Sequence, residues 1–259
     1  MSTHLPGKFV WFEHVSNQLQ KARKFYDPLF NWHTESMPMG DQRYSMIFNG
    51  SESIGGYRSA ADGERAHWLA YLSVDDVDTA YATALAAGAR AVQPPADFPT
   101  VGRGATVADP SGALFALWKG LGDDRPDVTP TPLGDWTWNE LWTRDEIGAL
   151  AFYQRVFGYS HESMDMGPQG TYYMLKKAGV SRAGMMRSTQ PRAPSLWLPY
   201  VAVADCDAVA SKVPHLGGQV LSAPSDIPGM GRFSVFADPV GAAVAVYTPA
   251  GPAIDTRSA

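Results

Sequence analysis

The sequence predicts an α+β protein made of two tandem domains, each of two βαβββ modules. Three observations lead to this prediction. Long stretches of the chain recur 127 or 129 residues later. Within each copy, a strand, a helix and three further strands are predicted twice in succession. A segment rich in Gly, Pro and Asp, GLGDDRPDVTPTPLG, separates the two copies.

The internal repeat covers nearly the whole chain. The segment GRGATVADPSGALFALW, residues 102–118, returns as GRFSVFADPVGAAVAVY, residues 231–247. Nearer the N-terminus, WFEHV and the FY pair of the first copy correspond to WNELW and a second FY pair. Insertions between the copies are therefore small, and we expect domains at 8–119 and 135–249, joined by a linker at 120–134.

The elements of the first copy follow from local pattern. An apolar, β-rich run predicts a strand at 9–16, and apolar residues at helical spacing predict a helix at 17–30, which Pro28 should strain or end. Strands are predicted at 32–37, 44–50 and 53–58, then a strand at 67–74, an Ala-rich helix at 76–89, and strands at 90–96, 102–109 and 113–119. In the second copy, Thr143 and Glu146 are spaced as a capping box at the start of the matching helix.

The repeated Asp-Pro-x-Gly sequence at Asp109 and Asp238 is typical of a type I turn between two strands. The Asp side chain accepts hydrogen bonds at the first position, Pro fixes φ at the second, and Gly tolerates a positive φ. Turn chemistry thus explains every residue of the motif.

Composition excludes several classes of partner. The net charge of −5 disfavours nucleic acid and anionic membranes, and the single cysteine, Cys206, excludes an internal disulfide or a thiolate metal cluster. No long apolar run predicts a membrane span, and the N-terminal residues lack the pattern of a signal peptide. We therefore expect a cytoplasmic protein, monomer or homodimer, whose partner is a small molecule.

The chain resembles the vicinal oxygen chelate superfamily, which includes glyoxalase I, bleomycin-resistance proteins and extradiol dioxygenases. The resemblance rests on the FYxxLF and FYxxVFG helices, the VDDVD…AAGA helix and the GR…DPxGA hairpin. It is similar to a two-domain, glyoxalase-like subgroup of that superfamily. The resemblance implies that the two βαβββ modules of each domain form a curved mixed sheet around a U-shaped cleft. This fold supports many chemistries.

The resemblance also implies where a metal would be held, on the first and last strands of paired modules. Counting from the motifs places these four positions on the residues Trp11 and Trp138, Gly55-Gly56 and Ala183-Gly184, Leu69 and Leu198, Ala116 and Ala245. None of these side chains ligates a metal. A slip of two residues would supply Glu13 and His67, still fewer than the roughly three protein ligands of a catalytic site. We expect no metal and no cofactor.

Glu13 and Glu140 occupy equal places in the two first strands, two residues after Trp11 and Trp138. A carboxylate in an apolar strand either acts in acid–base or ligand chemistry or forms a salt bridge with an arginine such as Arg103 or Arg232. His67 is the one histidine on the same strand face as the expected cleft, and either a catalytic or an ordinary structural histidine fits it.

Several large rings lie on the predicted sheet faces, where they serve either the core or a cleft for flat apolar ligands. The sequence predicts two catalytic residues, Glu13 and His67. It predicts ligand-binding residues at Trp11, Tyr44, Tyr71, Arg103, Trp138, Glu140, Tyr172, Tyr200 and Arg232.

Three functions fit these observations. The first is a metal-independent protein that binds an apolar or aromatic small molecule in a cleft between modules. The second is an enzyme of the same superfamily, a lyase, isomerase or hydroxylase-like protein, metal-independent or with an atypical metal site. The third is a structural or regulatory protein. The two halves should differ in function, because the second copy has no counterparts of His67, Tyr57 and Glu52. Leu196, Met185 and Val180 stand near those places in its sequence.

Overall fold

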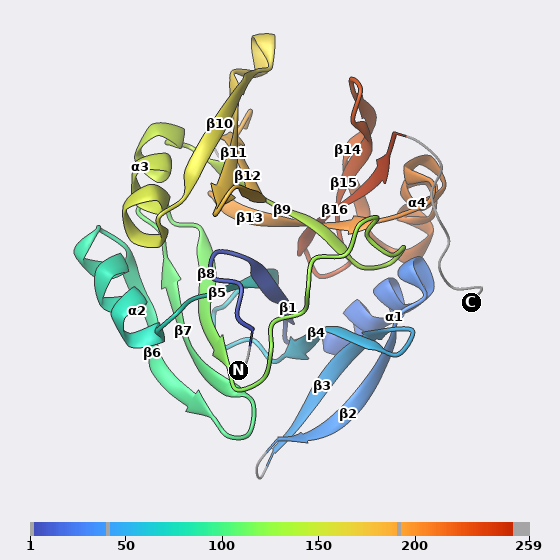
Figure 1. Cartoon of the computed structure of the whole chain (residues 1–259). Helices are drawn as coiled ribbons and strands as arrows, with labels where there is room; N and C mark the ends of the chain where they lie inside the picture. Colours follow the sequence, from blue (N-terminus) through green and yellow to red (C-terminus); the bar gives the residue numbers. More distant parts are fainter. Residues whose placement is uncertain (1–2, 40–41, 191–192, 251–259) are drawn as a thin grey trace. The chain divides into compact units, whose positions relative to one another are not determined.

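The computed structural model describes residues 3–39, 42–190 and 193–250, which form sixteen strands and four α-helices within these ranges (Figure 1). The first repeat contains β1 (Phe9–Val15), α1 (Leu19–Phe30), β2 (His33–Met39), β3 (Gln42–Asn49), β4 (Glu52–Arg58), β5 (His67–Ser73), α2 (Val77–Ala86), β6 (Arg90–Phe98), β7 (Gly102–Ala108) and β8 (Leu114–Gly120). The second contains β9 (Trp136–Thr143), α3 (Glu146–Phe157), β10 (Ser160–Asp165), β11 (Thr171–Lys177), β12 (Val180–Arg187), β13 (Leu196–Ala202), α4 (Cys206–Lys212), β14 (Gln219–Ile227), β15 (Gly231–Ala237) and β16 (Ala243–Pro249), with 3-10 turns at Gly167–Gln169 and Pro214–Leu216.

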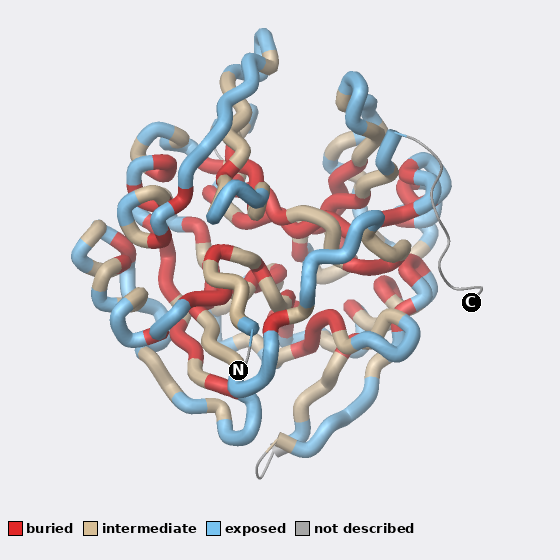
Figure 2. Tube along the Cα trace, in the orientation of Figure 1, coloured by how far each residue is buried: buried red, intermediate tan, exposed pale blue. Residues whose placement is uncertain are grey.

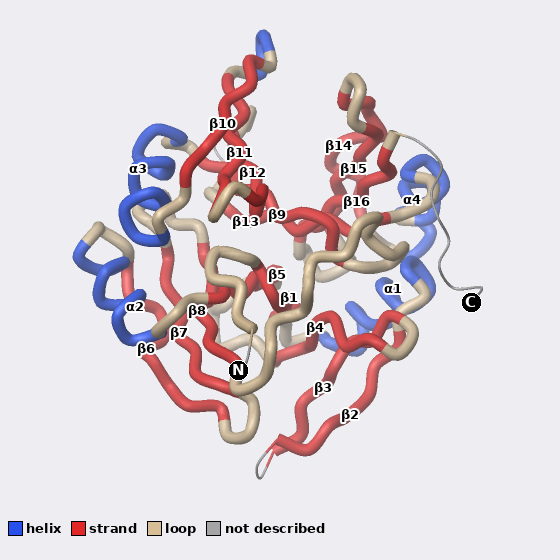
Figure 3. Tube along the Cα trace, in the orientation of Figure 1, coloured by secondary structure: helices blue, strands red, loops and turns tan. Residues whose placement is uncertain are grey.

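The predicted βαβββ order occurs four times, and the fold is α+β with two tandem copies. The strand orders are β2-β3-β4-β1-β5-β8-β7-β6 and β10-β11-β12-β9-β13-β16-β15-β14 (Figure 3). In each module the first strand pairs in parallel with the fourth, as β1 does with β4, and the second, third and fourth strands pair antiparallel in sequence. The parallel pair places residues of distant chain segments side by side.

The chain also divides into two compact units. One contains residues 1–11, 69–125 and 138–197; the other contains residues 12–68, 126–137 and 198–259. Each unit therefore takes one module from each repeat, the second with the third and the first with the fourth. The bounds 8–119 and 135–249 describe the sequence repeat. That these ranges are separate domains stays a prediction.

Strand alternation separates two faces of the first module. Residues such as Ile47 and Tyr57 are buried on the face that carries α1, whose buried side chains include Tyr26 and Phe30. Glu13, Gly56 and Tyr44 lie on the opposite face, since Glu13 pairs with Gly56 and Tyr44 is one residue from Ser45, the partner of Tyr57. Burial is deepest along the central strands and lowest at the ends of the hairpins (Figure 2).

The Asp-Pro-x-Gly turns do more than reverse the chain. Asp109 is 2% exposed and its Oδ1 accepts hydrogen bonds from the N–H groups of Ser111 (2.8 Å) and Ala113 (3.0 Å). Its Oδ2 accepts from the hydroxyl of Tyr153 at 3.0 Å, and the indole of Trp197 donates to the same hydroxyl at 2.9 Å. The turn thus fastens to the FY helix of the neighbouring module in its unit, a contact the turn motif alone does not reveal.

The other unit repeats this arrangement with one addition. Asp238 accepts from the N–H groups of Val240 and Ala242, both at 2.9 Å, and its Oδ2 lies 2.7 Å from Nε2 of His14, which is fully buried. Trp68 donates to the hydroxyl of Tyr26 at 2.9 Å, as Trp197 does to Tyr153. The repeated motif therefore marks a repeated buried contact.

One local prediction is wrong, and Pro28 does not end the first helix. The N-cap of α3 is Asp145, whose carboxylate accepts from the N–H of Gly148 at 3.0 Å, because Thr143 is still the last residue of β9. Helix α1 continues through Pro28 and ends two residues later, where Asn31 adopts the left-handed conformation (φ 57°). No helix among the described residues has the length and apolar character to cross a membrane.

Candidate functional site

A buried carboxylate lies on the sheet face of the first module that is opposite α1. Glu13, in β1, is 4% exposed, and its Oε1 accepts a hydrogen bond from the Tyr44 hydroxyl at 2.9 Å. Gly56 faces Glu13 across the parallel β1–β4 pair, and a Cβ at this glycine would lie only 2.0 Å from the Tyr44 oxygen. Gly56 is therefore required here, because the phenol of Tyr44 fills the space that a side chain would need.

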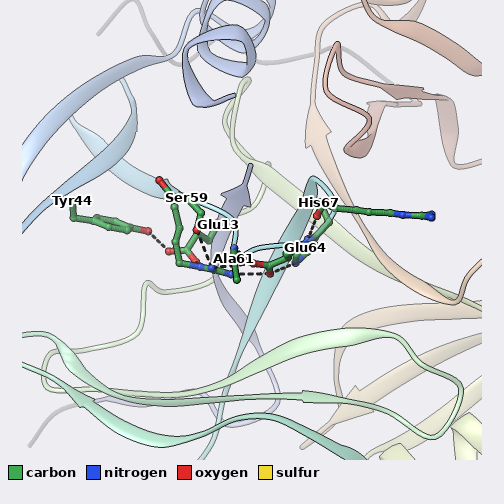
Figure 4. Close-up of polar contacts among 8 residues, drawn as sticks. Glu13, Tyr44, Ser59, Ala61, Glu64 and His67 are labelled. Atoms are coloured by element: carbon green, nitrogen blue, oxygen red, sulfur yellow. Dashed lines mark hydrogen bonds and ion pairs between the residues drawn. The ribbon is translucent and has the colours of Figure 1, made fainter. Parts of the chain in front are cut away.

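A chain of charged groups runs from this carboxylate to His67 (Figure 4). Arg58 Nε donates to Glu13 Oε2 at 2.9 Å, and Arg58 Nη2 donates to Glu64 Oε1 at 3.2 Å. Nε2 of His67 lies 3.9 Å from Glu64 Oε1, and its Nδ1 lies 2.9 Å from the carbonyl oxygen of Arg65. The two predicted catalytic residues are thus joined through Arg58 and Glu64.

The electrostatic state of this chain follows from burial and pairing. Burial lowers the pKa of the Arg58 guanidinium, but its bonds to Glu64 and Glu13 outweigh this and raise the pKa overall. Burial raises the pKa of Glu64, and Arg58 and the N–H of Ala61 outweigh it, so that the pKa lies below its ordinary value. Burial holds the pKa of His67 below 6.5. At neutral pH Glu64 is therefore a carboxylate, Arg58 a guanidinium and His67 an uncharged imidazole.

The second repeat builds a similar centre around Glu140, which is 6% exposed. Its Oε2 accepts from the Tyr172 hydroxyl at 2.8 Å, and Gly184 faces it across the β9–β12 pair. A Cβ at Gly184 would lie 1.9 Å from the Tyr172 oxygen. The indole of Trp138 donates to that hydroxyl at 2.9 Å, and burial together with Glu140 raises the pKa of Tyr172 far above its ordinary value.

The two centres differ in one exchanged pair of residues. Val15 faces Arg58 across β1–β4, whereas Trp142 faces Met186 at the same place across β9–β12. The indole of Trp142 donates to Glu140 Oε1 at 2.5 Å. A guanidinium donor in the first repeat is therefore replaced by an indole donor in the second, which gives the second centre a more aromatic surface.

Comparison with known proteins agrees with this architecture. Residues 8–117 match the family model described as Glyoxalase/Bleomycin resistance protein/Dioxygenase superfamily. The chain is 35% identical over 258 residues to "Putative glyoxylase CFP32" of Mycobacterium tuberculosis, covering 96% of this chain and 97% of that protein. This chain belongs to the glyoxalase/bleomycin resistance/dioxygenase superfamily. It is also 30% identical to "Anthracycline biosynthesis protein DnrV" of Streptomyces peucetius, over 95% of this chain and 94% of that protein.

Solved structures of the superfamily share the fold at low sequence identity. The Mn(II)-bound glyoxalase of Novosphingobium aromaticivorans has a TM-score of 0.64 at 17% identity, covering 94% of this chain and 82% of that one. The 2,2',3-trihydroxybiphenyl 1,2-dioxygenase of Sphingomonas wittichii has a TM-score of 0.63 at 14% identity, covering 100% and 94%. These likenesses establish the fold alone.

The residues of this chain do not fit the metal site of such superfamily members. At the second ligand position the Tyr44 phenol excludes any side chain on Gly56, and Tyr172 does the same at Gly184. At the third position, Leu69 offers only a buried hydrocarbon side chain. Within residues 3–39, 42–190 and 193–250, no three His, Cys, Asp or Glu side chains gather as a metal-binding group. No step of a mechanism is therefore derived through a metal here.

Arg103 and Arg232 do not form the anticipated salt bridges with the glutamates. Arg103 binds Asp78 with Nε and Nη2 at 2.7 and 2.8 Å and Asp97 with Nη1 at 2.7 Å. Arg232 binds Asp207 and Asp226 in the same way, at 2.6 to 2.9 Å. The reason is local, because one aspartate of each pair lies in the first turn of a helix and the other faces the arginine across a strand pair.

The remaining predicted ligand residues have mixed surroundings. Tyr71 is half-buried, with its ring 5.8 Å from that of Trp118, while Tyr200 is 5% exposed. Trp11 is half-buried. Arg232 also lines an open depression of about 440 Å³ at the β14–β15 turn, together with Asp226, Ile227, Pro228, Gly229, Gly231, Thr248, Pro249 and Ala250. That depression shares no residue with the Glu13 centre, and ligand binding at these positions stays a prediction.

Sequence reasoning missed Arg58 and Glu64, the two residues that link Glu13 to His67. Arg58 could have been found, because it lies two residues after Gly56 and therefore on the same strand face. Glu64 lies in the loop between β4 and β5, where strand alternation gives no direction.

Proposed function

We propose that this protein binds an apolar or aromatic small molecule, without the superfamily metal, on the sheet face that carries Glu13. The ligand site predicted between modules would include this face. Glu13, Tyr44 and Arg58 would orient the polar group of the ligand, and the large rings of the sheet would contact its flat surface.

The observation that supports this proposal is the Tyr44–Glu13 pair above Gly56, repeated as Tyr172–Glu140 above Gly184. In both repeats a phenol occupies the place where a second metal ligand would project. A buried carboxylate with fixed donors is a preformed polar anchor, and the exposed 39% of the Arg58 side chain lies beside it.

The names of the relatives suggest suitable probes. Two relatives are named as anthracycline biosynthesis proteins, and their sequences align over 95% of this chain. An anthracycline and smaller fused-ring aromatics such as 2-naphthol are therefore the first compounds to test. Quenching of tryptophan fluorescence would report binding, since rings lie on both sheets.

The experiment measures binding of these probes to protein treated with a metal chelator, by fluorescence and by calorimetry. We expect saturable binding that chelation leaves unchanged and that Glu13→Gln weakens. Binding that appears only after a divalent metal is added back would contradict the proposal. An Asp78→Asn variant, which alters an exposed ion pair with Arg103, serves as the matched control and should bind like the wild type.

Catalysis at the same face is the second candidate function. The observation that favours it is the connected set of acid–base residue types Glu13, Glu64 and His67, in which Arg58 hydrogen-bonds both glutamates and His67 lies 3.9 Å from Glu64. If the protein is an enzyme, prolonged incubation should convert a bound probe into a product that differs in mass or in chromatographic retention, and Glu13→Gln should abolish the conversion. Recovery of every bound probe unaltered would favour the binding function.

A further inference from the structure

The histidine at the end of the charged chain has a defined hydrogen-bonding state. Its Nδ1 lies 2.9 Å from the Arg65 carbonyl oxygen, which can only accept, so Nδ1 must carry the hydrogen. In the uncharged ring Nε2 is then a bare acceptor. Among the described residues it has no hydrogen-bond partner, although it is screened from solvent.

The ion-pair partner of this acceptor is another acceptor. Glu64 Oε1 lies 3.9 Å from Nε2, and both of its carboxylate oxygens already accept from Arg58. His67 Nε2 is therefore the unsatisfied acceptor of the two, and an O–H or N–H group beside it completes the arrangement.

We propose that His67 and Glu64 form the part of the site that recognises a hydrogen-bond donor, specifically a hydroxyl group, on the aromatic ligand. This inference rests on the proposed function and specifies the class of ligand. His67 acts as the specificity-determining residue and Glu64 as its neighbour in the same contact. The side chains are 23% and 24% exposed, so a ligand hydroxyl can approach between them once the Glu64 carboxylate moves aside.

The charges around His67 keep it an acceptor. Burial lowers the pKa of the ring, and Arg58 and His14 act in the same direction. Glu64 and the Arg65 carbonyl oppose this, but the net direction is downward. The uncharged ring therefore predominates above about pH 6.5, and Nε2 is available to a donor under those conditions.

The second repeat provides an internal comparison. Leu196 stands where the first repeat has His67, and Met186 stands where it has Arg58. The equivalent face of the second repeat thus lacks both the histidine of the acceptor pair and the arginine that binds Glu64. Recognition of a hydroxyl is accordingly assigned to the first repeat only.

The test compares two probes at pH 8. 2-Naphthol has a hydroxyl donor, and 2-methoxynaphthalene is its methyl ether, which has none. The ratio of their dissociation constants is measured for the wild type, for His67→Leu, which copies the second repeat, and for His215→Leu as an exposed control. We expect this ratio to show a preference for the naphthol that is about 3- to 10-fold smaller in His67→Leu than in the wild type. A change of this size is the contribution of one hydrogen bond. His215→Leu should keep the full preference.

A second measurement uses the wild type alone. Long-range proton–nitrogen NMR spectra should show His67 with its hydrogen on Nδ1, and 2-naphthol, but not its methyl ether, should shift the Nε2 resonance. An unchanged ratio in His67→Leu, or a hydrogen on Nε2 in the free protein, would overturn this inference while leaving the proposed function intact. Failure of both probes to bind would overturn the proposed function and the inference with it.

Discussion

Glu13 and Glu140 occupy corresponding positions in the two repeats but have different hydrogen-bond donors around them. Both are nearly fully buried and both accept from a tyrosine over a glycine. The next donor is the Arg58 guanidinium for Glu13 and the Trp142 indole for Glu140. Because Arg58 also binds Glu64, it keeps a carboxylate partner if Glu13 is neutralised.

The two glutamates should therefore respond differently to the same substitution. We expect Glu13→Gln to weaken ligand binding while the melting temperature stays within a few degrees. Glu140→Gln should destabilise the fold by about 1–3 kcal/mol, because an amide NH₂ group would face the buried indole or phenol donor. Thermal unfolding and probe titration of both variants check this. Equal losses of stability with unchanged binding would show that both glutamates are structural.

The lowered pKa of His67 gives a prediction for stability against pH. Because burial lowers the pKa in the folded state below 6.5, the unfolded chain binds the proton more readily. The contribution of His67 is complete above about pH 6.5 and is lost as the pH falls through the lower, folded value. Urea unfolding at several pH values from 7.5 to 5 should thus show a smaller decline for His67→Leu than for the wild type. Parallel declines would contradict the lowered pKa.

At the scale of elements, α1 covers an unusually polar part of the sheet. The Arg23 guanidinium lies 5.2 Å from the centre of the Tyr57 ring, and the Tyr57 hydroxyl is buried without a partner among the described residues. Burial, with a further contribution from Asp27, raises the pKa of Tyr57, which stays protonated. The second repeat has Leu150 and Met185 at the places of Arg23 and Tyr57.

Removal of this hydroxyl should not weaken the packing of α1. Tyr57→Phe is expected to leave stability unchanged or to raise it by up to about 1 kcal/mol, because a buried hydroxyl without a partner is unfavourable. The matched control is Tyr26→Phe, since the Tyr26 hydroxyl accepts from Trp68; this variant should lose about 1–3 kcal/mol. Chemical unfolding measures both. A loss in Tyr57→Phe as large as that in Tyr26→Phe would indicate an ordered partner for its hydroxyl.

Sequence patterns predicted the helices and strands better than the side-chain contacts between them. The offset of the repeat and the apolar periodicity predicted the βαβββ order, and the spacing from Trp11 to Glu13 predicted a shared strand face. The partners of Asp109, Asp238, Arg103 and Arg232 were not foreseen. Each contact joins residues that only the folded chain brings together, and a turn motif explains Asp109 without any need for Tyr153.

At the scale of the whole molecule, duplication has produced two halves of one fold with different chemistry. In the first repeat both faces of the β1–β4 pair carry polar groups, with Arg58 on one face and His14 and Tyr57 on the other. The corresponding residues of the second repeat are Met186, Leu141 and Met185. We infer that the first repeat recognises the ligand and that the second repeat has a structural role.

Titration calorimetry of the chelator-treated protein with 2-naphthol, combined with elemental analysis of the same preparation before that treatment, tests this account most directly. We predict binding at a single site per chain in protein that contains no stoichiometric Zn, Ni, Fe or Mn. Two equal sites per chain would contradict the division of roles between the repeats. About one metal ion per chain, lost in Glu13→Ala together with binding, would contradict the claim that the Tyr44–Glu13 pair has replaced the metal site.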